Sequence, residues 1–145
     1  MTTSTREQTK AERSGRFLVE GKDSAGSVAV FEFGVPAGGK VPLAHSHDGY
    51  EETIYGLDGV LTWTVEGVQT DVGPGEALCI PRGAVHQFEN TGELDAKALA
   101  IVTPGILGPD YFRDVAAVLD EAAGGPPDLA ALAAVMRRHG LTPAP

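Results

Sequence analysis

Four residues that can bind a metal ion lie within strand-like sequence, and they constrain the fold more than any other feature. His45, His47 and Glu52 fall in one segment and His86 in another, about forty residues further on. The chain contains four histidines, and His139 is the one left over. Three imidazoles and a carboxylate suit a divalent transition metal when a β-scaffold brings them together. The sequence therefore predicts a metal site built on strands.

The His-x-His spacing is explained by the geometry of a strand. Successive side chains point to opposite faces, so His45 and His47 share one face and can hold one ion. An unbroken strand would place Glu51, rather than Glu52, on that face. The dipeptide at 48–49, Asp-Gly, is typical of a turn, and a bend or bulge there would bring Glu52 round instead. The residues alone leave Glu51 and Glu52 open as the fourth ligand.

The second segment is typical of a strand, a turn and a strand. Residues 76–80 are a short apolar run, and Pro-Arg-Gly at 81–83 is a turn. The turn sets the register of the next strand, so that His86, Phe88 and Asn90 share one face. Phe88 is then predicted to help wall a cavity beside the metal.

Together the two segments resemble the two motifs of the cupin superfamily. The first motif, G(X)5HXH(X)3,4E(X)6G, is matched by Gly39, His45, His47, Glu52 and Gly59, and the second, G(X)5PXG(X)2H(X)3N, by Gly75, Pro81, Gly83, His86 and Asn90. The resemblance is to small, single-domain members of the quercetin-dioxygenase-like type. It implies a mainly β fold, a cupin-type double-stranded β-helix or jelly-roll barrel. It also implies His45, His47, Glu52 and His86 as the metal ligands, and the spacing to Gly59 favours Glu52 over Glu51.

Hydrophobic periodicity divides the chain into three parts. Residues 1–15 are polar and are predicted to be a flexible tail, and residues 16–104 to form the cupin barrel. After Pro104 the period changes from two to about 3.6, which predicts two short C-terminal α-helices within a helical extension at 105–145. The second helix is predicted to begin at Asp128 as its N-cap and to end at Gly140. The helices could cap the open end of the barrel, pack on its outside or form a subunit interface.

Several single residues receive more specific predictions. Leu61 to Val65 should pair with Val68 to Val72 as a hairpin, with Trp63 in the core or facing the pocket, the core being favoured. Ile54, Trp63 and Phe88 are the candidate pocket residues. Cys79 is predicted to be a small buried hydrophobe and not a ligand, and His139 to end a helix.

Composition excludes several classes of function. The net charge is −9 and the pI about 4.8, and the few basic residues form no patch, which argues against nucleic-acid binding. A single cysteine rules out an internal disulfide framework. No apolar run is long enough for a signal peptide or a membrane span, so a cytoplasmic protein is expected.

Function is predicted mainly from the resemblance. A metal held by three neutral imidazoles and one carboxylate carries a net charge near +1 and keeps one or two open positions. The resemblance implies a metal-dependent oxidoreductase of the dioxygenase type, acting on a small oxygenated organic substrate that chelates Fe, Mn, Ni, Co, Cu or Zn. Glu52 would be both ligand and catalytic proton acceptor. The resemblance also implies a homodimer. The alternatives are a non-redox isomerase or lyase, which would work without dioxygen, and a non-catalytic module that binds metal or a small ligand.

Overall fold

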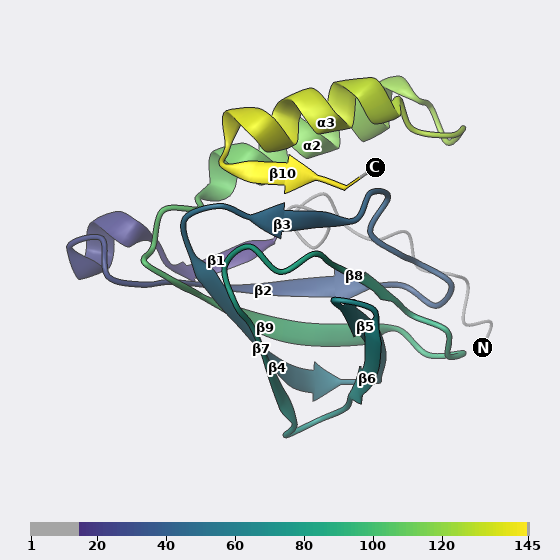
Figure 1. Ribbon diagram of the computed structural model, residues 1–145. Helices are drawn as coiled ribbons and strands as arrows, with labels where there is room; N and C mark the ends of the chain where they lie inside the picture. Colours follow the sequence, from purple (N-terminus) through teal and green to yellow (C-terminus); the bar gives the residue numbers. More distant parts are fainter. Residues whose placement is uncertain (1–14, 145) are drawn as a thin grey trace.

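Two five-stranded antiparallel sheets form the body of the protein in a computed structural model that describes residues 15–144 (Figure 1). Sheet A has the order β1 (Arg16–Val19), β2 (Ala29–Val35), β9 (Ala96–Thr103), β4 (Glu51–Asp58), β7 (Ala77–Ile80). Sheet B has the order β10 (Leu141–Pro143), β3 (His45–His47), β8 (His86–Glu89), β5 (Leu61–Val65), β6 (Val68–Val72). Within residues 15–144 the helical segments are η1 (Gly21–Ser24), α2 (Pro109–Glu121) and α3 (Leu129–Arg138). The predicted mainly β jelly roll followed by two helices is confirmed, whereas the predicted tail lies, apart from Gly15, outside the described residues.

The core lies between the sheets and combines large and small side chains. Alternate residues of β9, all alanine or valine, are buried, and β2 is paired with it in register. Phe31 stands opposite Ala100, and Phe33 opposite Ala98. Because alanine occupies little space, the phenylalanine rings and the neighbouring Trp63 have room to form an aromatic cluster.

The chain crosses from one sheet to the other between β3 and β4. β3 belongs to sheet B and ends at His47, and β4 begins at Glu51 in sheet A. Residues 48 and 49 form the bend that the sequence predicted. Because the two strands lie in different sheets, the alternation of faces does not continue from His47 to Glu52.

The hairpin of β5 and β6 is confirmed, residue for residue. Leu61 pairs with Val72 and Val65 with Val68. Glu66 and Gly67 both have positive φ angles, of 48° and 78°, which is typical of the two-residue turn that follows the twist of a hairpin.

The C-terminal helices cover one end of the barrel. Phe112 of α2 packs edge-on against Phe17 and Phe31 of sheet A, and α3 continues into β10, which lies beside β3 (Figure 1). The side chain of Asp128 accepts a hydrogen bond from the Ala131 amide, so the predicted N-cap is confirmed. Of the three arrangements left open, the structure has the helices capping the barrel.

Two details of the fold differ from the predictions. Within the predicted helical extension, Leu141 to Pro143 form the unpredicted strand β10, whose three residues give too short a pattern to recognise. Cys79 was predicted to be buried and is exposed. It lies on β7, an edge strand of sheet A, where Ile80 is buried and Cys79 points to the opposite face.

β10 provides a test of how firmly β3 is held. Hydrogen bonds from the Asp48 amide to the Gly140 carbonyl and from the Ala144 amide to the Ala44 carbonyl bracket the pair Thr142 and Ser46. The alternation of an antiparallel ladder directs the Thr142 amide toward β3. Thr142→Pro should therefore lower the free energy of unfolding by roughly 1–3 kcal/mol and accelerate amide hydrogen exchange in β3 but not in β6.

The matched control is Thr142→Val. It removes only the exposed 2.6 Å hydrogen bond from the Thr142 hydroxyl to Asp48, so the cost should stay below about 1 kcal/mol. Equal exchange in β3 for both variants would show that β10 does not hold the strand.

A second test concerns the contact between the two helices. Nε2 of His139 lies 2.8 Å from Oδ2 of Asp114, and this hydrogen bond, with Arg138 as a further partner, lowers the pKa of the Asp114 carboxyl. A lowered carboxyl pKa stabilises the fold above the unfolded value of about 3.9 and ceases to do so as the pH falls through the folded value. Asp114→Asn should therefore destabilise the protein at pH 7, and the difference from wild type should vanish in acid. Denaturant unfolding at several pH values measures this, with the exposed Asp58→Asn as the control; a difference that persists in acid would contradict it.

Candidate metal centre

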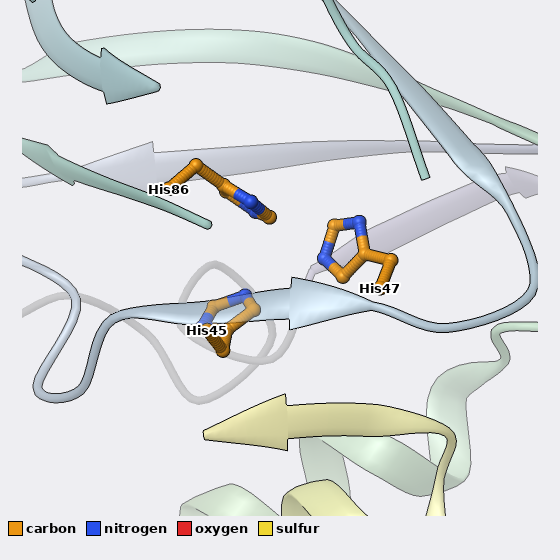
Figure 2. Close-up of side chains that lie close together, drawn as sticks. All are labelled: His45, His47 and His86. Atoms are coloured by element: carbon orange, nitrogen blue, oxygen red, sulfur yellow. The ribbon is translucent and has the colours of Figure 1, made fainter. Parts of the chain in front are cut away.

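Three histidine side chains converge at one point between the sheets (Figure 2). His45 and His47 come from the same face of β3, and His86 comes from β8, where it is paired with His45. The ring centroids are 4.4 to 5.2 Å apart. One nitrogen from each ring lies within 4.8 Å of the other two, and all three residues are buried. This is the spacing of ligands around a single ion.

Backbone carbonyls orient two of the rings. Nδ1 of His45 donates to the carbonyl of Leu43 at 2.9 Å, and Nδ1 of His86 to that of Ala84 at 3.0 Å. Because a carbonyl can only accept, the proton of each neutral ring is assigned to Nδ1, and Nε2 keeps its lone pair. Metal-binding histidines are commonly fixed by such a hydrogen bond from the other nitrogen.

His47 is oriented in a different way. Its Nδ1 is buried and has no hydrogen-bond partner within the described chain. Instead the ring stacks on Tyr50, with centroids 4.4 Å apart and planes 21° apart. Tyr50 is itself completely buried, and its hydroxyl is also without a partner there. The stacking contact therefore takes the place of the hydrogen bond that holds the other two rings.

Glu52 and Glu51, the two candidates for a fourth ligand, point in opposite directions. Glu52 is 8% exposed, lines the cavity, and has Oε1 4.0 Å from Nε2 of His86. Glu51 lies on the outer side, where it pairs with Arg82. Alternation along one unbroken strand would have placed Glu51 on the side of the histidines. The rule does not apply here, because the chain crosses from sheet B to sheet A between His47 and Glu52. Glu52 approaches His86 and lines the same cavity as the three histidines, and its role as a ligand stays a prediction.

Burial controls the charge of the site. Together with the neighbouring imidazoles, it lowers the pKa of His45 to about 4 and that of His47 to about 2, and it lowers the pKa of His86 as well. Burial raises the pKa of Glu52 to about 7, since no cation or hydrogen-bond donor among the described residues contacts the carboxylate. The rings are thus neutral and have free lone pairs, and the carboxyl group of Glu52 lacks a cation that would favour its charged form. A divalent cation satisfies both conditions, so the residues fit a metal.

The cluster opens onto a cavity of about 320 Å³ between the sheets and below the helices. Its polar side chains are the three histidines and Glu52, Tyr111 of α2, and Lys40, which is exposed. Most of the remaining lining is apolar: Phe31, Phe33, Val35, Pro36, Val41, Pro42, Trp63, Phe88, Leu107, Phe112, Val115, Leu119, Leu132, Met136 and Leu141. Such walls exclude water and strengthen electrostatic interactions at the metal end.

Two of the three candidate pocket residues line this cavity. Trp63 is 1% exposed and belongs to both the core and the cavity wall, with its ring 6.4 Å from that of His86. Phe88 packs on Trp63 and also lines the cavity. Ile54 is fully buried in the core and is not among the lining residues.

Sequence reasoning missed the part of the site that lies near or beyond the barrel. Tyr50 was not singled out, although it stands three residues from His47 across the bend. Tyr111 lies in the predicted helical extension and was not singled out either, and in the structure it lines the cavity. Burial and then the charge of Glu52 raise the pKa of the Tyr111 phenol. The signal in the sequence was the hydroxyl group of this tyrosine on an otherwise apolar helix face.

Asn90, the last residue of the second motif, has a structural task. Its side-chain amide donates to the carbonyls of Val35 and Leu94, at 3.0 and 2.8 Å, and it is 1% exposed. Its backbone bonds with Gly38 and Gly39. Asn90 therefore ties the end of β8 to the loop between β2 and β3, next to the mouth of the cavity.

Comparison with known proteins gives consistent matches. The family model described as a cupin domain matches residues 31–102, about half of the chain. Quercetin 2,3-dioxygenase from Bacillus subtilis (strain 168) is 28% identical over 98 residues, which are 68% of this chain but 28% of that enzyme. The chain thus spans less than a third of that curated relative.

Solved structures support the fold. A protein from Thermus thermophilus superimposes with a TM-score of 0.58 at 19% identity, covering 69% of this chain and 90% of that one. A sugar phosphate isomerase of the cupin superfamily from Silicibacter pomeroyi gives a TM-score of 0.52 at 22% identity, covering 70% and 67%. At these identities the likeness concerns the fold alone. No helix within residues 15–144 is both long and apolar enough to cross a membrane.

Tyr50 yields a test of the stacking contact. Tyr50→Leu should weaken metal binding roughly tenfold, because the ring that orients His47 is lost. Tyr50→Phe is the matched control: it keeps the stack and removes only a buried hydroxyl without a partner, so metal affinity should hold and stability rise by about 1 kcal/mol. Isothermal titration with Co²⁺ and denaturant unfolding measure the two quantities. Equal metal affinity in both variants would contradict the orienting role.

Proposed function

The chain belongs to the cupin superfamily, and from this premise we propose that it is a metal-dependent oxidoreductase of the dioxygenase type. Its substrate is a small oxygenated organic molecule that chelates the metal. The metal is one divalent ion out of Fe, Mn, Ni, Co, Cu or Zn, held by His45, His47, Glu52 and His86. The observation that carries the proposal is that the three neutral imidazoles and the buried carboxylate of Glu52 line one mainly apolar cavity.

Each part of the site has a task in this proposal. A bound metal would supply positive charge and open positions for two oxygen atoms of a ligand or for dioxygen. The three rings hold the ion through neutral nitrogens. Glu52 balances its charge and can accept a proton from a ligand hydroxyl, because its carboxylate faces the cavity beside His86. Trp63 and Phe88 exclude water from the reacting atoms.

The lining favours this proposal over a sugar phosphate isomerase. A phosphorylated sugar needs several hydrogen-bond donors and cations along its length. Lys40 is the one cation among the described residues that line the cavity, and it is exposed at the edge. An isomerase or lyase and a non-catalytic binding module remain as alternatives that the experiment separates.

The remaining parts of the proposal concern organisation. We also propose that residues 16–104 form a barrel and residues 105–145 a helical extension, and that the protein is a homodimer in the cytoplasm. Because β10 returns from the extension to pair with β3, the two parts share a sheet and should unfold together. Light scattering at several concentrations tests the dimer.

Elemental analysis of protein purified without chelators or a histidine tag tests the metal site. We expect about one equivalent of metal in wild type. In His47→Ala and in Glu52→Gln the affinity for the metal should fall by more than roughly tenfold, so that the purified variants contain less metal. Glu51→Gln is the matched control and should retain the metal, since its side chain pairs with Arg82. Absence of metal from wild type after reconstitution would contradict the proposal.

Oxygen uptake with a panel of enediols and hydroxyketones tests the reaction. Uptake that depends on both the metal and the compound supports an oxygenase. Turnover without dioxygen, with zinc bound, would instead indicate an isomerase or lyase. Tight metal and ligand binding without turnover of any compound would indicate a binding module.

A further inference from the structure

Tyr111 is a polar residue of the cavity that neither motif includes. It lies in the first turn of α2, outside the segment that matches the cupin domain family. The side chain is 7% exposed and lines the cavity together with the histidines and Glu52. A residue of the capping helix thus lines the cavity onto which the metal site opens.

The hydroxyl of Tyr111 is free to bind a ligand. It makes no hydrogen bond to any residue of the described chain, and it is not one of the sealed atoms, as the Tyr50 hydroxyl is. The Tyr111 ring packs against His139, two residues before Leu141, which is paired with His47 of the metal site. A phenol with an ordinary pKa of about 10 keeps its proton at neutral pH and can donate it in a hydrogen bond.

Other donors in the cavity are accounted for. The indole nitrogen of Trp63 is sealed from the cavity without a partner, and Lys40 lies at the exposed edge. The three histidines face one another around the proposed ion. Among the described side chains that line the cavity, Tyr111 is therefore the neutral donor left to meet a ligand.

We propose that the Tyr111 hydroxyl donates a hydrogen bond to an oxygen atom of the metal-chelating ligand and thereby selects ligands with two neighbouring oxygen atoms and an apolar remainder. This inference rests on the proposed function, since it needs a metal at the histidine cluster. It assigns ligand selection to the C-terminal helix, while the barrel provides the metal site.

Packing around Tyr111 supports a fixed position for the hydroxyl. Its ring lies edge-on to Phe112, with centroids 5.1 Å apart, and to His139, at 5.4 Å. Phe112 in turn packs against Phe31 of sheet A. Since both neighbours are anchored, by sheet A and by Asp114, the donor is held in place before a ligand binds, which reduces the entropic cost of binding.

The probe for the test is 4-nitrocatechol, which has two neighbouring oxygen atoms on an aromatic ring and a visible absorption band that reports its ionisation. Its affinity is measured by titration with metal-loaded protein under nitrogen, for wild type and Tyr111→Phe. We expect binding to weaken roughly tenfold in the variant, the effect of losing a hydrogen bond to a charged oxygen. The absorption band of the bound probe should also shift, which a purely structural loss would not produce.

Controls separate this inference from the proposed function. Metal content is measured on every sample, so wild type without metal would refute the proposed function itself. Tyr55→Phe is the matched control, because Tyr55 is an exposed tyrosine outside the cavity lining, and its affinity for the probe should equal that of wild type. Tyr111→Met removes the same hydroxyl with a different side chain and should reproduce the loss. Equal affinity of metal-loaded wild type and Tyr111→Phe, or no binding of 4-nitrocatechol to wild type, would overturn the role of Tyr111.

Discussion

The rest of the structure depends on the placement of three imidazoles and one carboxylate inside an apolar sandwich. Burying polar groups without partners costs free energy that a small domain recovers only from packing elsewhere. Here the carboxylate of Glu52 and Nδ1 of His47 have no hydrogen-bond partner in the described chain. A fold selected for stability alone would fill these positions with apolar residues. Their retention is explained if an ion supplies the missing charge, and the aromatic core and the capping helices then keep water away from it.

β3, the strand that provides two of the histidines, depends on segments far apart in the chain. It has three residues, and its ladder with β8 includes the single pair His45 and His86. On its other side β10 adds three paired residues. In addition, the amide of Gly83, which precedes β8, donates a hydrogen bond to the carbonyl of His47. So short a strand would be poorly fixed by β8 alone. The position of the metal site therefore depends on the C-terminal segment as well as on the barrel.

Sequence reasoning located the histidines because their spacing reflects strand alternation, a local property. It could not choose between Glu51 and Glu52 from alternation, because the chain changes sheets between His47 and Glu52 and the rule holds within one strand only. The exposure of Cys79 depends on which strand lies at the edge of sheet A, which is a property of topology. β10 and the contribution of Tyr111 depend on where the helices dock. Local patterns thus predicted the histidine cluster, and long-range pairing determines which residues surround it.

The division between barrel and helices has a chemical consequence. A divalent ion with three neutral rings and one carboxylate keeps a net charge near +1, and in apolar surroundings that charge favours a ligand carrying one negative charge. A chelating ligand that has lost one proton satisfies this condition and still has a second oxygen to accept a hydrogen bond. The barrel supplies Glu52 as the group that can take the proton, and α2 supplies Tyr111 as the donor. Because these two residues come from separate parts of the chain, a substitution of Tyr111 can alter which ligand is accepted while the barrel residues that hold the metal stay the same.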